Sequence, residues 1–471
     1  MKKQLIIAGI LLGSFAIMAQ NSADRDNSFN VTGLGTPVFP TGGQYSKVTP
    51  VEGGKVLVTG AFYSAATTTP AYSRILRLNS DGSFDNTFNV GGLGATGIIS
   101  ATAIQSDGKI IIGGGFPAYN GTSVNGIARI NPDGSLDNTF NPGTGFSSIL
   151  PPPWVRSIAI QEDGKIVVGG GFTSFNGTAI AGVCRLNADG SLDNTFSPGS
   201  GPNNIVEAVA IQTDGKIIAG GLFSSFDGVS NGRLVRLEAN GSLDGTFNTA
   251  TSGNILRVVV QPDGKILSSG ANFYRLETNG SLDAGFIPMT AGNSYNGLAL
   301  QSDGRIILSG FFTSYFSTPR ERIVRLNTNG TVDMTFDSEV GFSTNPNHLA
   351  IQPDGKILVF GGFEYKGVES VVTRIMGTPV PFLGIDNPAN QLDVNIFPNP
   401  ASININVTLD ESYMNQSVNL AVLNTAGQVV KQVLLDYSHT TIDLEQMPTG
   451  IYFYQIRNNN RVIKSGKIIV N

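Results

Sequence analysis

The chain has 471 residues, 14% of them charged, and a formal net charge of −5 at neutral pH. Its positive residues are scattered and form no basic stripe that could follow a phosphate backbone, so we expect no nucleic-acid partner. Glycine accounts for 59 residues, well above the usual share of about 7%, and recurs at fixed positions. This pattern indicates regular turns and tight packing.

The N-terminus has the pattern of an export signal. Lys2 and Lys3 precede an apolar run from Leu5 to Met18, and Ala19 follows. The run is too short to span a bilayer, so residues 1–20 are predicted to be a cleaved signal peptide that leaves no transmembrane anchor. A retained membrane anchor is the alternative. The single cysteine, Cys184, excludes an internal disulfide and takes a position that other copies of a repeat fill with Ala or Val. We therefore expect it in the core.

Residues 21–376 contain seven copies of one segment, at a period of about 50 residues that is typical of solenoids, arrays and propellers. One copy runs from Ser157 to Phe172 and from Val183 to Phe196. Each copy predicts four short strands: an apolar strand, a second ending in Gly-Gly, a third with Arg-Leu or Arg-Ile, and a fourth with Asp-x-Thr-Phe. Asp-Gly between the first two predicts a two-residue hairpin with positive φ at both central residues. The expected fold is all-β, a seven-bladed β-propeller of four-stranded blades.

A linear β-solenoid is the competing architecture, and the two ends of the repeat region favour a closed ring. The last copy stops at Met376 without its fourth strand, whereas an extra Asp26-Asn-Ser-Phe29 precedes the first copy. We expect that N-terminal segment to pair with Val371–Met376 and complete the last blade. An open solenoid leaves both ends unexplained.

The recurring pattern Asp-Gly-Lys-Ile, Gly-Gly-x-Phe and Arg-Leu-Asn-x-Asp-Gly-Ser-Leu-Asp-Asn-Thr-Phe resembles the delta-60 repeat family. This resemblance covers about residues 26–376 and implies a bacterial propeller-like protein without a settled function. The first copy departs from the pattern at Gly53-Gly54-Lys55, where Gly replaces Asp. The fifth copy is shorter, because Ser269–Phe273 leads almost directly into Arg275.

A linker over residues 377–390 precedes a different C-terminal region, residues 391–471. Its pieces Ile396–Ala401, Leu423–Gln428, Met447–Ile456 and Lys467–Val470 resemble the C-terminal sorting domain of the type IX secretion system. The resemblance implies that the protein reaches the periplasm and then passes through the outer membrane by that machinery, with removal of the domain and either release or attachment to a surface lipopolysaccharide. Alternating strands with Gly-marked turns predict a small β-sandwich, for which a carbohydrate-binding domain is the alternative interpretation.

The repeated polar residues have a structural and a functional interpretation. Asn131, Asp133, Ser135 and Asp137 alternate like the ligands of a calcium loop. Because Asn replaces Asp133 in three later copies while the next Gly stays, we expect a turn and predict no metal site. Arginines of the third strands and aspartates of the fourth are expected to pair, Arg374 with Asp26; a ring of anion-binding arginines is the alternative. The arginines are Arg77, Arg129, Arg185, Arg236, Arg275, Arg325 and Arg374, and the aspartates are Asp26, Asp85, Asp137, Asp193, Asp244, Asp283 and Asp333.

Few side chains are suited to catalysis. The two histidines, His348 and His439, build neither a metal site nor a triad, and no cofactor is predicted. His348 lies in a first strand where it is expected to pack or to line a central channel; a catalytic base is the alternative. The unrepeated glutamates show no spacing that selects a pair for glycoside cleavage. These are Glu207, Glu321, Glu339, Glu364 and Glu369.

Function in a repeat protein is expected where the repeat is broken. The longest insertion, Asn141–Trp154, holds Phe146 and the only Trp, and we predict Trp154 and Phe146 as ligand-binding residues. A Trp that only packs is the alternative. The predicted function is a non-catalytic binding or adhesion module for a glycan or protein, secreted or at the cell surface. A polysaccharide-active hydrolase or lyase using rim carboxylates is the runner-up, and a purely structural surface protein is a third interpretation.

Overall fold

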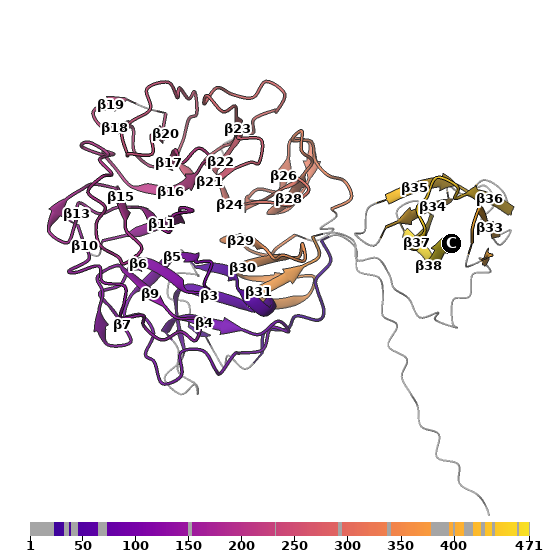
Figure 1. Ribbon diagram of the computed structural model, residues 1–471, viewed down its shortest axis with the longest axis horizontal. Helices are drawn as coiled ribbons and strands as arrows, with labels where there is room; N and C mark the ends of the chain where they lie inside the picture. Colours follow the sequence, from indigo (N-terminus) through magenta and orange to yellow (C-terminus); the bar gives the residue numbers. More distant parts are fainter. Residues whose placement is uncertain are drawn as a thin grey trace, which may run out of the picture. The chain divides into compact units, whose positions relative to one another are not determined.

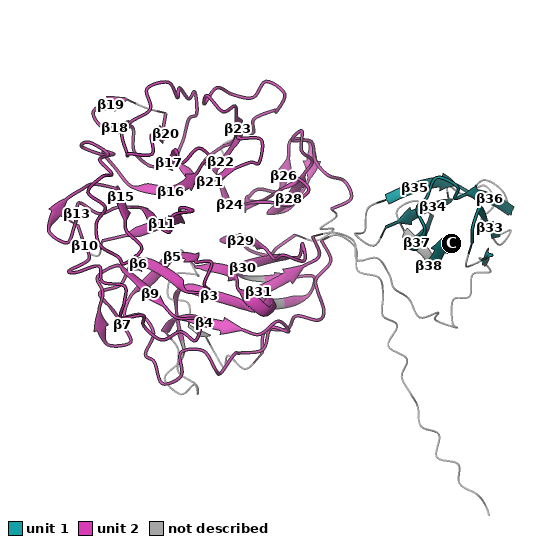
Figure 2. Ribbon diagram, in the orientation of Figure 1, with its two compact units in different colours: residues 1–21, 379–471 teal, residues 22–378 magenta. Residues whose placement is uncertain are grey.

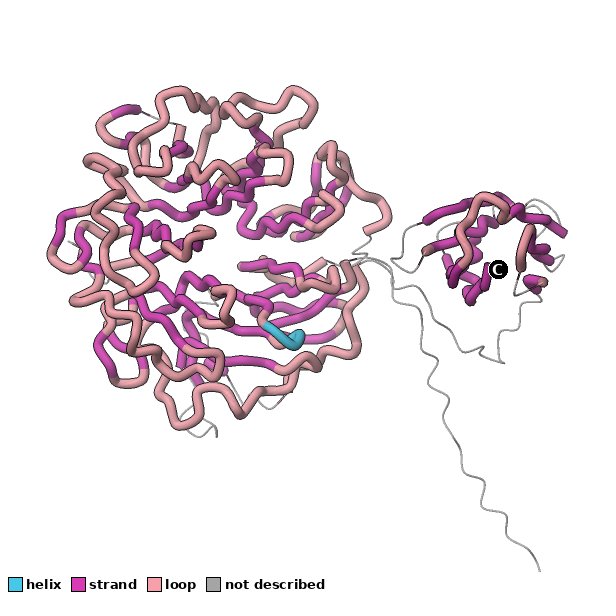
Figure 3. The backbone as a smooth tube through the Cα atoms, in the orientation of Figure 1, coloured by secondary structure: helices cyan, strands magenta, loops and turns pink. Residues whose placement is uncertain are grey.

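The computed structural model describes residues 23–32, 37–38, 46–64, 73–148, 153–230, 232–290, 294–336, 341–377, 395–398, 401–408, 418–424, 429–435, 439–458 and 461–470. Residues 22–378 form one compact unit, and residues 1–21 with 379–471 form the other (Figure 2). The predicted signal peptide and nearly all of the predicted linker lie outside the described residues. The described parts are β-structure, and their one helical element is the 3₁₀ turn η1, Glu52–Gly54 (Figure 3). They include no helix with the length and apolarity needed to cross a membrane.

The larger unit consists of antiparallel sheets in which a middle strand pairs with an inner and an outer strand (Figure 1). The inner strands are β2 Lys47–Pro50, β5 Ile98–Ile104, β11 Val155–Ile160, β16 Val206–Ile211, β21 Ile255–Val260, β24 Ser294–Leu300 and β29 His348–Ile351. The middle strands are β3 Val56–Ser64, β6 Ile110–Gly115, β12 Ile166–Gly170, β17 Ile217–Gly221, β22 Ile266–Gly270, β25 Ile306–Phe311 and β30 Ile357–Tyr365. The outer strands are β4 Ser73–Leu78, β9 Ile127–Ile130, β15 Val183–Leu186, β20 Leu234–Leu237, β23 Phe273–Leu276, β28 Ile323–Leu326 and β31 Val368–Ile375.

The inner strands form a closed ring. Each contacts the inner strand of the next sheet, and β29 contacts β2. The Gly-Gly positions of the middle strands allow the next sheet to approach: a Cβ on Gly169 would lie 2.8 Å from Cγ1 of Val206, on the inner strand of the following sheet. The middle strands are apolar because both faces are covered; every residue of β12 is buried. The fold is therefore an all-β, propeller-like ring of sheets.

The predicted fourth strand is reduced to a single β-bridge in the described copies, such as Leu237 with Leu243. The Asp-x-Thr-Phe segment that follows turns back on itself. Asp244 accepts hydrogen bonds at Oδ1 from the backbone N of Thr246 at 2.9 Å and from its hydroxyl at 2.6 Å. An Asp side chain that captures nearby donors offers the backbone an alternative to a strand ladder. This local competition explains why the predicted strand is so short.

The hairpin between inner and middle strands also differs from the prediction. Gly108 has φ of 81°, but Asp107 does not lie in the positive-φ region. The backbone N of Gly108 donates to Gln105 O at 3.0 Å, and that of Gln105 donates to Lys109 O at 2.8 Å. These bonds define a three-residue loop that ends in a glycine bulge, so the two-residue turn with two positive φ angles was wrong. The Asp107 side chain accepts a bond from the N of Lys109 instead.

The polar loops between middle and outer strands form small hairpins that the sequence did not predict. Asn120 and Gly121 have φ of 46° and 81°, as a tight primed turn requires, so this Asn-Gly-Thr motif is a turn. The fifth sheet lacks such a hairpin, as predicted, since only Ala271 and Asn272 separate β22 from β23. The hairpins are β7 Ala118–Tyr119 with β8 Thr122–Ser123, β13 Ser174–Phe175 with β14 Thr178–Ala179, β18 Ser225–Phe226 with β19 Val229–Ser230, and β26 Ser314–Tyr315 with β27 Thr318–Pro319. Two further short strands extend existing sheets: β10 Phe146–Ser147 pairs with β13, and β1 Pro37–Val38 pairs with β3.

The N-terminal segment completes the last sheet, which confirms the predicted pairing. Arg25 bridges to Ile375, and the backbone N of Asp26 donates to Arg374 O at 2.7 Å. The Phe29 side chain is 1% exposed and lies in a cluster that joins the last sheet to the first. The two ends of the repeat region are therefore held together by non-covalent contacts.

The core of this unit lies between successive sheets. One cluster, for example, joins Ile111 and Ile127 of one sheet to Val168 and Cys184 of the next. Cys184 is fully buried, as predicted, and burial raises the pKa of its thiol. Stability is therefore distributed around the ring through pairwise sheet contacts.

The C-terminal unit contains two sheets. One has the order β32 Asn395–Phe397, β33 Asn404–Thr408, β36 His439–Asp443. The other has the order β35 Val429–Leu434, β34 Val418–Leu423, β37 Gly450–Asn458, β38 Arg461–Val470. Ile405 and Ile442 of the first sheet share one core with Leu420, Ile456 and Ile468 of the second.

Candidate functional site

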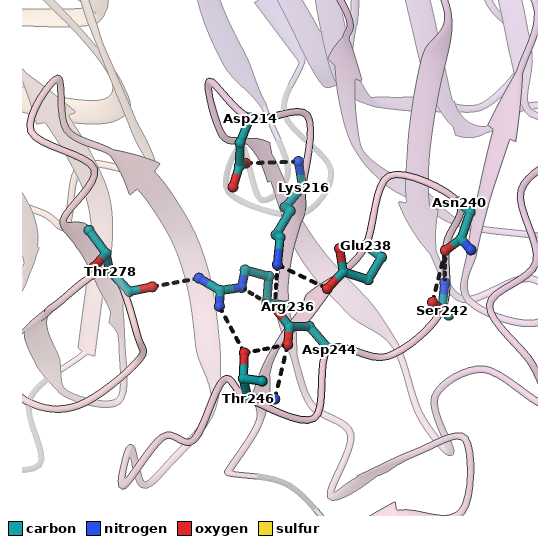
Figure 4. A network of polar contacts seen from close by, with 9 residues as sticks. All are labelled: Asp214, Lys216, Arg236, Glu238, Asn240, Ser242, Asp244, Thr246 and Thr278. Atoms are coloured by element: carbon teal, nitrogen blue, oxygen red, sulfur yellow. Dashed lines mark hydrogen bonds and ion pairs between the residues drawn. The ribbon is translucent and has the colours of Figure 1, made fainter.

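The repeated arginines and aspartates form a structural network, seen around Arg236 in Figure 4. Arg236 Nε lies 2.8 Å from Asp244 Oδ2, which also accepts a bond from Lys216 Nζ at 2.8 Å. Arg236 Nη1 donates to the carbonyl oxygen of Thr278 in the next sheet, and its guanidinium lies 4.8 Å from the centre of the Phe247 ring. One arginine therefore ties its own turn, the aromatic ring of the repeat and the neighbouring sheet together.

The network recurs in each repeat, which confirms the structural interpretation. Arg374 Nε lies 2.7 Å from Asp26 Oδ2, and its Nη1 donates to Ser80 O of the first sheet at 2.8 Å. The remaining arginine–aspartate pairs are Arg77–Asp85, Arg129–Asp137, Arg185–Asp193, Arg275–Asp283 and Arg325–Asp333. Since each of these arginines has a carboxylate partner, they do not form a ring of anion-binding groups.

The network keeps its carboxylates ionised. Burial alone raises the pKa of Asp26, but hydrogen bonds from Ser28 and Lys356 and the charge of Arg374 outweigh it and lower the pKa to about 2. The pKa of Asp283 is also lowered to about 2, because bonds from Lys265, Gly285 and Arg275 outweigh burial. Carboxylates of this kind do not donate protons at neutral pH.

The proposed calcium pattern is a turn. Asp133 Oδ1 accepts bonds from the N and the hydroxyl of Ser135 at 2.9 and 2.6 Å. Asp137 belongs to the arginine network. Among the described residues, no three His, Cys, Asp or Glu side chains come together as metal ligands would.

A second group of charged residues lies on the inner strands, and we call it the axial cluster: Lys47, Arg156, Glu207, Arg257 and His348. Lys47, Arg257 and His348 occupy equivalent register positions, opposite Thr59, Ser269 and Phe360 of their middle strands. The other copies hold Ala101, Ser157, Ala208 and Gly297 at this position.

Arg156 and Glu207 stand one residue earlier, each at a register shift of β11 or β16. A bulge of this kind redirects a side chain away from the regular ladder. Arg156 Nε lies 3.6 Å from Glu207 Oε1. Arg156 is 8% exposed, whereas Lys47, Glu207, Arg257 and His348 are half-buried. The axial cluster therefore keeps some contact with solvent.

The charges of the axial cluster act on one another across the ring. Burial, followed by the charges of Arg257 and Arg156, lowers the pKa of Lys47 to about 7, although Glu207 acts in the opposite direction. Burial and the charges of Lys47 and Arg257 hold the pKa of His348 well below 6.5. The axial cluster thus gathers three cationic side chains and one carboxylate, with a neutral histidine beside them at neutral pH.

The proton of the neutral His348 ring can be assigned from its contact with the neighbouring strand. The backbone N of Val48 donates to His348 Nδ1 at 3.4 Å. Because Nδ1 accepts this bond, the proton lies on Nε2. His348 therefore contributes a hydrogen-bond donor and no positive charge.

The structure places the two predicted ligand-binding residues in different surroundings. Phe146 is 3% exposed, and its ring centre lies 4.4 Å from that of Phe172 and 4.7 Å from that of Phe175. Its ring contributes to the core and presents almost no surface to a ligand. Trp154 is half-buried, and the guanidinium of Arg156 lies 4.6 Å from the centre of its ring. Trp154 thus borders the axial cluster, and a ligand role for either residue stays a prediction.

The repeat pattern alone did not predict Lys47, Arg156 or Arg257 as site residues. The usable signal was a long charged side chain at a register position that other copies fill with Ala, Ser or Gly. The signal is clear at His348, but it is obscured at Lys47 because the first repeat departs from the pattern. Of the unrepeated glutamates, Glu207 pairs with Arg156, and Glu321 pairs with Arg322 at 2.7 Å.

Two family models match the sequence. A domain of unknown function, the DUF5122 β-propeller, matches residues 54–88, 105–140, 161–196, 212–247, 261–286 and 301–336. A secretion system C-terminal sorting domain matches residues 395–471. No curated protein matches this sequence.

Among solved structures, this chain matches PorZ, an essential bacterial surface component of the type IX secretion system of Porphyromonas gingivalis, at 11% identity and a TM-score of 0.42. The similarity covers 92% of this chain and 60% of PorZ. The extracellular domain of BT4673 from B. thetaiotaomicron is 12% identical with a TM-score of 0.48, covering 96% of this chain and 60% of that one. The WD40 β-propeller domain of Doa1 is 12% identical with a TM-score of 0.47, covering 75% and 96%. This chain thus spans about three fifths of the first two proteins.

The sorting domain identifies the destination of the protein. It implies handling by the type IX secretion system and delivery to the cell surface or to the outside of the cell. The matched repeats contain six of the seven arginine–aspartate pairs of the network, and the pair of Arg374 with Asp26 lies outside them. The chain thus carries repeats that match the DUF5122 β-propeller model, followed by a segment that matches a secretion system C-terminal sorting domain.

Proposed function

We propose that this protein is a non-catalytic binding module that acts at the cell surface or after secretion. In this proposal residues 1–20 are a signal peptide, residues 21–376 form a seven-bladed propeller, residues 377–390 are a linker, and residues 391–471 are a β-sandwich sorting domain. The seven sequence repeats, the closed ring of inner strands and the N-terminal strand pairing support the blade number.

The axial cluster is the observation that carries the proposal. Charged side chains in a protein interior are costly unless they are paired, and perturbed ionisable groups gather at functional sites. The repeated arginines each have their own carboxylate within 2.8 Å, whereas in the axial cluster the three cations Lys47, Arg156 and Arg257 stand beside one carboxylate, Glu207. A surplus of half-buried positive charge on the ring axis is suited to holding a ligand.

The same residues argue against catalysis. General acid–base chemistry needs a group whose pKa lies near the working pH together with a partner of opposite function. The network aspartates are held ionised, and Glu207 faces Arg156. His348 is neutral, but its pKa is far below neutrality and its Nδ1 is engaged by Val48. Lys47, whose pKa is lowered to about 7, is the exception, but the one carboxylate of the axial cluster, Glu207, lies against Arg156, so we favour binding over proton transfer.

The ligand we propose is a glycan or a protein that reaches the axis past Trp154. A tryptophan beside a cationic group offers an apolar face and hydrogen-bond donors together. The purified secreted protein would be mixed with a panel of polysaccharides and passed over a sizing column. Co-elution of intact polymer, lost in a Trp154→Ala variant and kept in a control Tyr63→Ala variant, supports the proposal. Shortened polymer would overturn it in favour of a hydrolase or lyase.

A further inference from the structure

We propose that the axial cluster is an oxyanion-binding site that takes a carboxylate, phosphate or sulfate group of its ligand. This inference rests on the proposed function, because it names the chemical class that the binding module recognises. The carrier can be a small free anion or the acidic group of a larger molecule, since the chemistry at the site is the same.

The charge balance gives the sign and the size of the ligand charge. Lys47, Arg156 and Arg257 supply three positive charges when protonated, and Glu207 supplies one negative charge, so the axial cluster has a surplus of two. The whole chain has a net charge of −5, so this surplus runs against the overall charge. A bound dianion, or two monoanions, would restore neutrality at the axis.

The hydrogen-bonding groups at the axis are donors. An arginine presents a planar fork of N–H groups that matches a carboxylate or phosphate, and a lysine adds a point charge. Arg257 uses Nη1 for the carbonyl oxygen of Leu256 at 2.8 Å, but its buried Nε has no hydrogen-bond partner among the described residues. His348 adds the Nε2 donor derived above. Arg257 on β21 thus has an unsatisfied donor among the described residues, and Lys47 on β2 and His348 on β29 contribute further donor groups.

The electrostatics of the axial cluster agree with this geometry. Burial and mutual repulsion lower the pKa of Lys47 to about 7 and also lower the pKa of Arg257. An anion placed among these groups would offset the repulsion and return the pKa of Lys47 toward its ordinary value. Binding should therefore be accompanied by proton uptake near pH 7 and should weaken as pH rises, by up to about tenfold per pH unit above that pKa.

The test is isothermal titration calorimetry of the full-length protein with inorganic phosphate, with sulfate and with citrate, at pH 6, 7 and 8. The variants are Lys47→Met and Arg257→Met, which keep an unbranched, flexible side chain but remove its charge. The control is Arg320→Met, which removes a cation from the loop after β27, where Arg320 bonds to the carbonyl oxygen of Pro319. Thermal unfolding of each variant checks that the fold is retained.

We expect at least one of the three anions to bind with proton uptake at pH 7, and to bind at least about tenfold more weakly to either axial variant but not to the control. Absence of binding by all three anions, or equal binding by wild type and axial variants, would overturn the inference. Polygalacturonate and a neutral polysaccharide, tested alongside, distinguish a polymer-borne acidic group from a free anion. If a polymer co-elutes equally well with both axial variants, the binding module stands and the oxyanion site does not.

Discussion

The ring closure can be tested by removing one carboxylate, with Asp26→Asn. Asp26 is 2% exposed and lies 2.7 Å from Arg374 Nε and 3.1 Å from Lys356 Nζ. Its pKa is lowered from 3.8 to about 2, which at about 1.4 kcal/mol per unit corresponds to about 2 kcal/mol of stability at neutral pH. Removing one partner of a buried pair costs about 3–5 kcal/mol, because the other charge is left uncompensated. We therefore expect a loss of about 2–5 kcal/mol in the free energy of unfolding.

The matched control is Asp244→Asn, which removes the equivalent carboxylate of an internal repeat (Figure 4). The segment around Asp244 is covalently continuous with the sheets on both sides, whereas residues 23–29 are held to β31 only by non-covalent contacts. Urea unfolding should show a loss in both variants. Amide exchange of residues 23–29, read by mass spectrometry, should rise only in Asp26→Asn. Protection of these residues in Asp26→Asn, or equal exposure in both variants, would refute the closure argument.

Three further predictions follow from the charged groups and the sorting domain. The pKa values of Asp26 and Asp283 are lowered, so their contribution to stability is complete above about pH 4 and disappears as pH falls toward 2. The loss of unfolding free energy caused by Asp26→Asn should therefore be smaller in urea titrations at pH 3. An unchanged loss would contradict its origin in the ion pair. Between pH 7 and 10.5 the unfolded chain binds more protons at Lys47 than the folded chain does, so the stability of the wild type should increase with pH in this range. Lys47→Met should raise the urea midpoint at pH 7 and make the midpoint increase less between pH 7 and pH 9. If the midpoints of variant and wild type change equally with pH, Lys47 does not carry a buried charge. Deletion of residues 393–471 should retain the protein in the periplasm, as cell fractionation would show, and normal surface display would disprove the need for the sorting domain.

The sequence predicted the features that each repeat determines locally or by symmetry. The all-β ring, the pairing of Arg374 with Asp26 and the buried Cys184 follow from positions that recur in register. Details that depend on competing hydrogen bonds were predicted less well. The side chain of Asp107 bonds to Lys109 N and leaves the positive φ to Gly108, and the Asp side chains of the last turns shorten the fourth strand to a bridge. Spacing alone does not show which donor an Asp side chain will capture.

The position of the axial cluster also explains why it was harder to predict than the loop that holds Trp154. A loop residue is far from its equivalents in the other sheets, so an unusual loop changes one place on the rim. An inner-strand position is brought close to its equivalents by the ring, so substitutions in different repeats meet at one place. Val48 and His348 stand 300 residues apart in sequence and share a hydrogen bond. In a closed repeat fold, charged residues that replace small ones at the same inner-strand position of different repeats should therefore be considered together. Here these residues are Lys47, Arg257 and His348.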